Sequence, residues 1–223
     1  MDDKVSIVIP NYNRWDLTHI LLFGLYQRCA SIDEIIVVND GCTQEESFSG
    51  LDWWKSTELL PVRELRLKKN VGFLKASNAG MKQATGDITI LISNDVIVRG
   101  DIVLRIRHNI DMIPNVLVGG RLLDWNTGWN EFDGKIFPYL EGWLLAARSD
   151  LLEHIDYFDE QYAPHDFEDV DISTKVIEQV AGSLVALPED ITFHQSAQTI
   201  GYNPEREELT KQNREKFREK WLK

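Results

Sequence analysis

The stretch ITILISND, residues 88–95, decides the fold that we expect for this chain. Five consecutive apolar or β-branched residues predict a buried strand, and a polar triplet that ends in Asp95 follows directly. In open α/β sheets, ligands bind beyond the carboxyl ends of the strands. Asp95 therefore stands where a carboxylate could hold a divalent metal ion, which could in turn hold a diphosphate.

Further strand-like runs lie on both sides of this stretch and alternate with helical patterns. This alternation is typical of βαβ units and predicts an α/β fold, an open and mostly parallel sheet with flanking helices. Right-handed crossovers place the loops after successive strands at one edge of the sheet, where we expect the chemistry. A late helix is expected over residues 169–180. The expected strands are residues 5–9, 34–38, 63–67, 87–92, 116–119 and 184–187.

Composition narrows the class of protein. The chain has 223 residues, 43% of them hydrophobic, which predicts one domain over residues 1–203 and a charged helix over residues 204–223. No apolar run is long enough to span a membrane, and the first residues do not resemble an export signal, so we expect a cytoplasmic protein. The net charge of -12 disfavours a nucleic-acid acceptor without excluding it. Glutamates interleave with the basic residues after Arg206, which favours a solvated helix with ion pairs over a DNA-binding arm.

Two polar segments directly follow the first two expected strands. Residues 10–13 read PNYN, and residues 39–41 read NDG. An aromatic ring beside amide and carboxylate groups suits a pocket for a base and a ribose. The same residue types are common in turns, so ordinary turn chemistry is the alternative for each segment alone.

The segment NVGF, residues 70–73, follows the third expected strand and leads into a helix. A glycine at such a turn lets a ligand approach the backbone, and the start of the helix offers free N–H groups to a phosphate. Neither a GxGxxG pattern nor a GxxxxGK loop is present, so dinucleotide binding and P-loop binding are not supported.

Carboxylates and one histidine complete the set of candidates. Residues 168–171 read EDVD and open the late helix, where they could be helix caps, or one could be a general base. His194 ends a short apolar run and could join Asp95 at a metal ion, although a lone histidine is more often structural.

Taken in order along the chain, these segments resemble the family 2 glycosyltransferases of the GT-A fold. The resemblance covers about residues 4 to 200 and rests on six motifs in the family's order: residues 5–13, 37–42, 70–72 with 78–80, 93–95, 168–171 and His194. It implies an open mixed sheet with a nucleotide-binding, Rossmann-like half and an acceptor half. It also implies an inverting transferase that moves a sugar from a nucleotide-diphosphate donor, most simply a UDP-sugar such as UDP-glucose, to a hydroxyl of a saccharide or another acceptor.

The resemblance also implies roles for individual residues. Asp169 matches the base, and Asp95 and His194 match the ligands of Mn²⁺ or Mg²⁺. Trp143 lies in a segment that resembles the family's acceptor-side strand, near the donor sugar. The residues expected to bind the nucleotide or the donor are Pro10, Tyr12, Asn13, Asp40, Asn70, Gly72, Asn78, Asn94 and Trp143.

The chain departs from the family's pattern at the triplet. Where further acidic residues are common, it has Ser93 and Asn94, so we expect weaker metal affinity or more ligation by phosphate and water. Glu168, Trp125 and Trp129 are the acceptor-side candidates, because aromatic faces stack well on sugars, although the two tryptophans also suit plain core packing.

Two alternatives stay open. A non-catalytic module that binds a nucleotide or a sugar is compatible with a triplet that has only one acidic residue, Asp95. A nucleotidyltransferase ranks lower, because its glycine-rich and basic loop would stand where this chain has PNYNR, residues 10–14.

Overall fold

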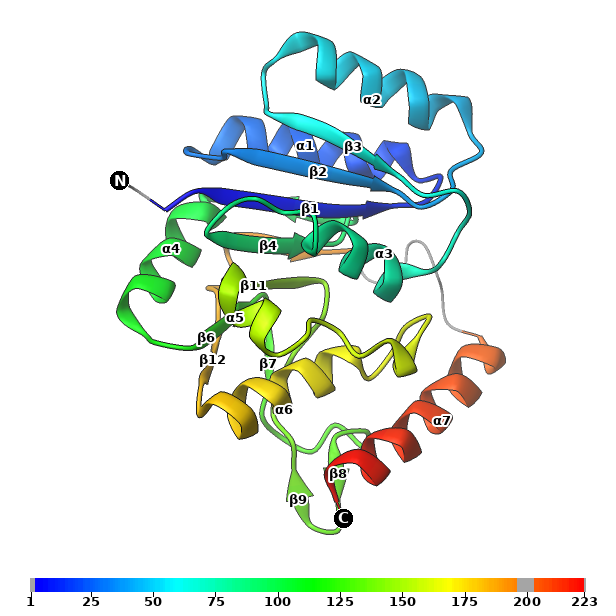
Figure 1. The fold of residues 1–223 in the computed structure, drawn as a ribbon, viewed down its shortest axis with the longest axis vertical. Coiled ribbons are helices and arrows are strands. Elements are labelled where there is room, and N and C mark those ends of the chain that lie inside the picture. The colour runs from blue at the N-terminus through cyan, green and yellow to red at the C-terminus, as the bar shows by residue number, and fades with distance from the viewer. Residues whose placement is uncertain (1–2, 196–202, 223) are drawn as a thin grey trace.

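A seven-stranded mixed sheet forms the centre of the computed structural model, which describes residues 3–195 and 203–222 (Figure 1). The strand order is β12-β6-β11-β4-β1-β2-β3, and only β11 runs antiparallel to its neighbours β4 and β6. The expected open and mostly parallel sheet is therefore confirmed. Its strands are β1 (Val5–Asn11), β2 (Glu34–Asn39), β3 (Val62–Arg66), β4 (Ile88–Ile92), β6 (Val116–Gly119), β11 (Leu144–Arg148) and β12 (Ser183–Ala186).

Each expected strand is present, with ends that move by one or two residues. The runs were readable because β1 and β4 are buried along their whole length, which selects continuous apolar sequence. The antiparallel placement of β11 between β4 and β6 was not predicted, since local sequence does not encode strand direction.

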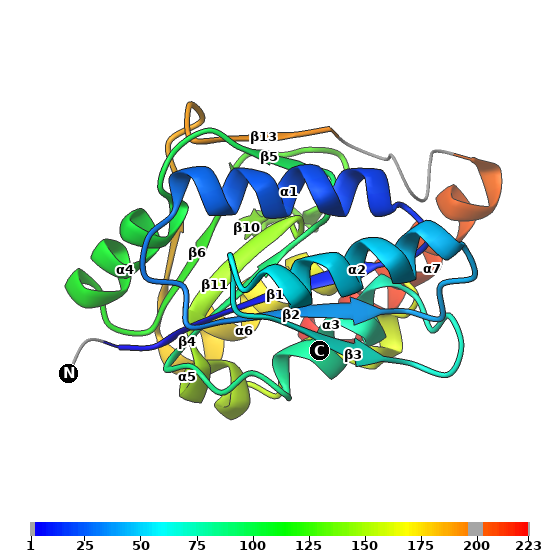
Figure 2. The ribbon, with the colours of Figure 1, turned by 90° about the horizontal axis from the view of Figure 1, so that it is seen from above.

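Helices cover both faces of the sheet, so alternate strand residues enter two cores. Ile7 and Ile9 pack with α1 (Trp15–Arg28), α2 (Glu45–Thr57) and α4 (Ile102–Met112). Val8 lies in the second core. Figure 2 shows α1 on one side of the sheet and α3 and α5 on the other. The helices of the second core are α3 (Phe73–Met81), α5 (Ser149–His154), α6 (Glu168–Val180) and α7 (Pro204–Trp221).

Short strand pairs lie beyond the main sheet. Antiparallel pairing of β5 (Val96–Val98) with β13 (Thr192–His194) sets His194 opposite Val96. This pairing carries a late residue to the carboxyl end of β4. The other pairs are β7 (Leu122–Leu123) with β10 (Tyr139–Leu140) and β8 (Glu131–Phe132) with β9 (Lys135–Ile136).

The charged helix near the end of the chain is present as α7. The prediction that it is solvated is wrong along one face, which is buried. Asn213 and Phe217 are both fully buried, and Phe217 stacks on Phe132 with ring centroids 5.3 Å apart. Asn213, Phe217 and Trp221 recur every four residues, and this narrow stripe suffices to dock a helix that is otherwise highly charged. The domain boundary at residue 203 stays a prediction.

Within residues 3–195 and 203–222, no helix has the length and apolarity needed to cross a bilayer. The cytoplasmic location stays a prediction.

Replacing Phe217 by Ala should lower the free energy of unfolding by about 3–5 kcal/mol, because it removes a fully buried ring from an aromatic cluster. Denaturant unfolding of the full chain measures this change. Phe23→Ala is the matched control, since Phe23 is about half exposed on α1 and should change stability little. Equal effects of the two substitutions would contradict the docking of α7.

Candidate active site

The carboxyl ends of β1 and β2 meet a turn that Asp40 holds in place. Its carboxylate accepts hydrogen bonds from the backbone N–H groups of Val71 (2.8 Å) and Gly72 (3.1 Å). Burial raises the pKa of Asp40, and these two bonds act against that rise. Gly72 has a φ of +87°, and a Cβ there would lie 2.7 Å from the Pro164 side chain, so the turn requires glycine. Asp40 thus fixes the conformation of the turn that contains Asn70 and Gly72.

The segment after β1 offers one exposed aromatic ring. Pro10 is buried within the strand, whereas Tyr12 is 37% exposed at its end. Asn13 accepts hydrogen bonds through Oδ1 from the backbone N–H groups of Thr43 (2.7 Å) and Gln44 (3.2 Å). Asn13 therefore organises the start of α2, and the Tyr12 ring is left exposed just after β1.

Two asparagines of the expected donor set point into the protein instead. Asn94 donates to Thr18 Oγ1 (3.2 Å) and Asn11 Oδ1 (3.3 Å), which ties the end of β4 to β1 and α1. Asn78 both donates to and accepts from the backbone of Phe158, at 2.9 and 3.1 Å. Both are almost fully buried, so the structure does not bring them to the open side of the edge. Asn94 needs an N–H to donate, and a carboxylate in its place would repel Asn11 Oδ1.

Asp95 and His194 do meet, as the sequence predicts. Asp95 Oδ1 lies 3.3 Å from His194 Nε2. The Trp143 ring stacks on the imidazole with centroids 5.0 Å apart and an interplanar angle of 19°, and Trp143 Nε1 donates to Glu141 (2.9 Å). Gly120 makes room for this ring, because a Cβ there would lie 1.8 Å from it. The imidazole plane is therefore set by neighbours that are themselves fixed.

This pair can supply part of a metal site. In the described ranges 3–195 and 203–222, no group of three or more His, Cys, Asp or Glu side chains could hold a metal ion. Asp95 Oδ1 is buried and, apart from its approach to His194, meets no hydrogen-bond donor among these residues. One carboxylate and one imidazole fit a divalent ion that takes its other ligands from phosphate and water.

Glu168 and Asp169 begin α6 after two residues with left-handed backbone, Asp166 (φ 70°) and Phe167 (φ 76°). Asp169 Oδ2 accepts a hydrogen bond from the backbone N–H of Gly142 (3.2 Å). Burial, joined by the charges of Asp166 and Glu141, raises the pKa of Asp169 to about 7.

Burial and the neighbouring Asp169 charge raise the pKa of Glu168 well above its usual range. Its Oε2 is buried without a hydrogen-bond partner in the described part of the chain. Two adjacent carboxyl groups thus favour sharing a single negative charge near neutral pH.

The acceptor-side tryptophans lie at the surface. Trp125 is 48% exposed and Trp129 is 39% exposed, which excludes plain core packing for both rings. The Arg121 guanidinium lies 5.9 Å from the centre of the Trp125 ring and 3.9 Å from Glu141. Sequence reasoning missed Arg121 and Glu141, although Glu141 stands two residues before Trp143 and could have been found by that adjacency.

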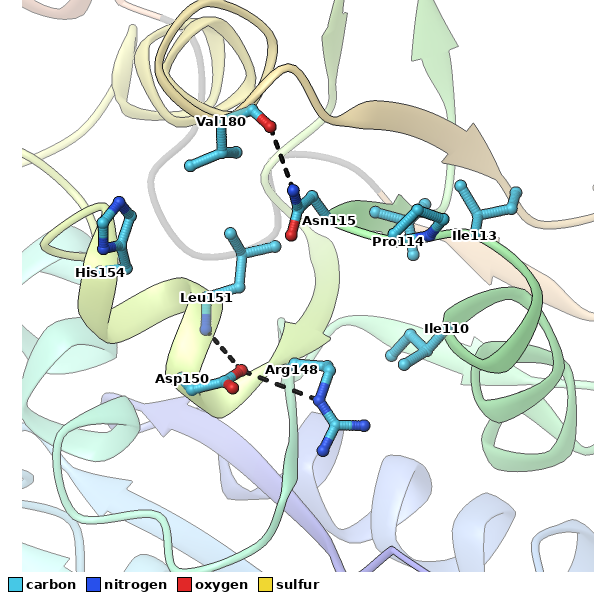
Figure 3. Close-up of a pocket in the computed structure, with 10 residues that line it drawn as sticks. Ile110, Ile113, Pro114, Asn115, Arg148, Asp150, Leu151, His154 and Val180 are labelled. Carbon is cyan, nitrogen blue, oxygen red and sulfur yellow. Dashed lines mark hydrogen bonds and ion pairs between the residues drawn. The ribbon is translucent and has the colours of Figure 1, made fainter.

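A pocket of about 590 Å³ lies at the opposite edge of the sheet (Figure 3). It is lined where β6 begins and β11 ends, near Asn115, Arg148 and His154. Arg148 faces the start of β4 in the sheet register, whereas Asp95 follows the other end of that strand. This pocket is therefore remote from the Asp95 and Asp169 carboxylates.

The family model of glycosyl transferase family 2 matches residues 6–167. An uncharacterized glycosyltransferase of Rickettsia bellii is 31% identical over 176 residues, which cover 73% of this chain and 24% of that protein. The uncharacterized glycosyltransferase YwdF of Bacillus subtilis is 36% identical over 92 residues, which cover 41% of this chain and 32% of YwdF. The chain thus spans a third or less of the length of these two curated relatives.

Two solved structures share the fold. One is GalNAc-T7 with UDP, GalNAc and Mn²⁺, with a TM-score of 0.78 and 17% identity over 99% of this chain and 49% of that chain. The other is the mannosyltransferase PcManGT from Pyrobaculum calidifontis with GDP-Man and Mn²⁺, with a TM-score of 0.69 and 19% identity over 90% of this chain and 59% of that chain. These likenesses confirm the expected GT-A fold.

The raised pKa of Asp169 predicts a stability that falls as the pH rises. Its folded-state pKa of about 7 exceeds the ordinary value of 3.8, so the folded protein holds a proton that the unfolded chain has lost. Asp169→Asn should therefore raise the free energy of unfolding, by about 2–3 kcal/mol more at pH 8 than at pH 5. Denaturant unfolding at both pH values measures this gain. Asp111→Asn, at an exposed position on α4, should show no such difference, and a pH-independent effect of Asp169→Asn would contradict the assignment.

Proposed function

This chain belongs to glycosyl transferase family 2, and from that premise we propose that it transfers a sugar from a nucleotide-diphosphate donor to an acceptor hydroxyl with inversion at the anomeric carbon. One observation carries the proposal: two consecutive residues link both reactive groups. Gly142 donates its backbone N–H to Asp169, while the Trp143 ring stacks on His194 beside Asp95. Two consecutive residues, Gly142 and Trp143, therefore contact the proposed base and the proposed metal-binding pair.

We propose a UDP-sugar as the donor, with UDP-glucose as the first candidate. Support comes from relatives whose names or structures include UDP, such as the Escherichia coli UDP-Gal galactosyltransferase, 32% identical over 78 residues, and GalNAc-T7. In this proposal Tyr12 stacks on the base, and the turn that Asp40 holds, with Asn70 and Gly72, borders the donor. Trp143 borders the donor sugar.

Asp95 and His194 would hold Mn²⁺ or Mg²⁺, which supplies charge neutralisation to the departing diphosphate. Asp169 takes the proton of the acceptor hydroxyl while the acceptor oxygen forms a bond to the anomeric carbon. The bond from that carbon to the diphosphate oxygen breaks on the opposite face, so the configuration inverts. Burial and the neighbouring Asp169 charge raise the pKa of Glu168 well above its usual range, and the proposal assigns the single negative charge of the pair to Asp169.

The acceptor side is proposed to bind a saccharide. Trp125 and Trp129 present exposed rings, and aromatic faces stack on the C–H surfaces of sugars. In this proposal, the Trp125 and Trp129 rings select the acceptor, which presents one of its hydroxyl groups to Asp169.

The full chain, incubated with a panel of nucleotide sugars and Mn²⁺, should release the nucleoside diphosphate from a UDP-sugar. Asp95→Asn should weaken UDP binding in the presence of Mn²⁺ about tenfold by calorimetry, because it removes a charged metal ligand. UDP binding without metal should not change.

Asp111→Asn is the control for this substitution and should bind UDP and Mn²⁺ as the unsubstituted chain does. Binding across the panel without turnover on any acceptor would favour the non-catalytic module. Release of pyrophosphate would favour the nucleotidyltransferase.

The transfer rate should rise with pH through about 7, because the base must be ionised to accept the proton and its pKa lies there. Below that value the rate should fall about tenfold for each pH unit. Asp169→Asn should lower transfer by about 10²- to 10⁴-fold and leave the affinity for UDP and Mn²⁺ intact. A pH-rate profile for the two proteins tests this, and transfer that survives in Asp169→Asn would show that the base is another group.

A further inference from the structure

The turn before α6 has a backbone conformation that it cannot hold by itself. Asp166 and Phe167 are consecutive non-glycine residues with φ values of 70° and 76°, in the left-handed region that side chains disfavour. Such residues persist where their surroundings fix them. These two residues set the direction in which Glu168 and Asp169 leave the turn, because α6 starts directly after them.

Asn213 of α7 hydrogen-bonds to the backbone of this turn. Its Nδ2 lies 2.9 Å from the carbonyl oxygen of Tyr162, 3.0 Å from that of His165 and 2.9 Å from that of Asp166. The side chain is fully buried, and its Oδ1 accepts a hydrogen bond from Lys216 (2.8 Å). One amide nitrogen therefore faces three carbonyl groups of the turn, which Figure 1 shows alongside α7.

Asp166 is held by the same face of α7. The Arg206 guanidinium donates to its two carboxylate oxygens at 3.0 and 2.6 Å, and the Thr210 hydroxyl donates at 2.8 Å. Together with His165, these contacts keep the pKa of Asp166 well below its usual range, so the carboxylate stays charged. Arg206, Thr210 and Asn213 are spaced by four and three residues, which places them in one row on the helix.

A second contact lies on the other side of the base. Asp171, which is fully buried, accepts hydrogen bonds from Lys220 Nζ (2.9 Å) and Trp221 Nε1 (2.8 Å). The helix α7 thus contacts Asp166, three residues before Asp169, and Asp171, two residues after it. It lies outside residues 6–167, which the family model matches.

We propose that α7 is a positioning element for the base, in which Asn213, Arg206 and Thr210 hold the turn of residues 162–167 so that Asp169 faces the acceptor hydroxyl. The proposal rests on the proposed role of Asp169. Arg206, Thr210 and Asn213 act through the backbone of this turn and are positioning residues.

Arg206→Gln and Thr210→Val should lower the kcat of transfer by about 10- to 100-fold in combination, because a displaced base loses its reach to the hydroxyl. The loss in kcat should exceed any change in the donor KM or in the affinity for UDP and Mn²⁺, because Arg206 and Thr210 contact Asp166, whereas the donor turn at Gly72 meets this segment at Pro164. Arg206→Lys should recover part of the loss in Arg206→Gln, because it restores the charge opposite Asp166. A purely structural role would lower kcat and UDP affinity together and would overturn the proposal.

A double-mutant cycle isolates the central contact. Asp166→Asn combined with Arg206→Gln should lower kcat no more than the more damaging single substitution does, because each substitution removes the same contact between Asp166 and Arg206. Additive losses would overturn the coupling of this pair. Gln212→Ala, at an exposed position next to Asn213, is the control on the same helix and should retain full kcat. Asn213→Ala is the strongest variant, and the Arg206 and Thr210 variants decide the matter if it does not fold.

Hydrogen exchange separates failure of this proposal from failure of the proposed function. In the full chain, the amides of residues 163–171 should exchange about tenfold faster in Arg206→Gln than in the unsubstituted protein, while those of β4 stay unchanged. This result supports the positioning role even if no donor is turned over. Unchanged exchange over residues 163–171 would overturn the proposal whether or not the protein is active.

Discussion

The antiparallel insertion of β11 between β4 and β6 is the constraint on which the site depends. Because β11 runs against its neighbours, its first residues, and not its last, lie at the edge where β4 ends. Leu144 pairs with Ile92, so Gly142 and Trp143 fall beside the triplet that carries Asp95. The Gly142 N–H can then donate to Asp169, the proposed base, while the ring of the next residue, Trp143, stacks on the imidazole of His194. A parallel strand in that place would bring its far end to this edge.

Burial sets the electrostatics of the two reactive groups in different ways. Asp169 and Glu168 are removed from water beside each other, so the pKa values of both carboxyl groups rise. Asp95 has one buried oxygen that faces the imidazole. The middle of the triplet is an amide that donates to Asn11 and Thr18, and a carboxylate in its place would lose both of these hydrogen bonds.

Local sequence predicted what local physics decides, and it failed where a distant partner decides. The strands were readable from β-branched runs, and the meeting of Asp95 with His194 followed from the order of the family's motifs. Asn78 and Asn94 stay predicted donor residues, but local sequence did not show their hydrogen-bond partners, which lie up to 83 residues away along the chain. The docking of α7 was hidden because Phe217 and Trp221 are a small minority in an 18-residue helix dominated by charge.

The residues proposed to bind the donor and the metal ion and to act as the base come from two parts of the chain. The part matched by the family model, residues 6–167, contributes Tyr12, the turn held by Asp40, and Asp95. Asp169, His194 and α7 all come after it. A left-handed turn joins the two parts, and the residues that hold this turn belong to the later part. In the proposed mechanism the base is thus positioned by a helix that begins more than thirty residues after it, so substitutions on that helix are expected to change the rate of transfer.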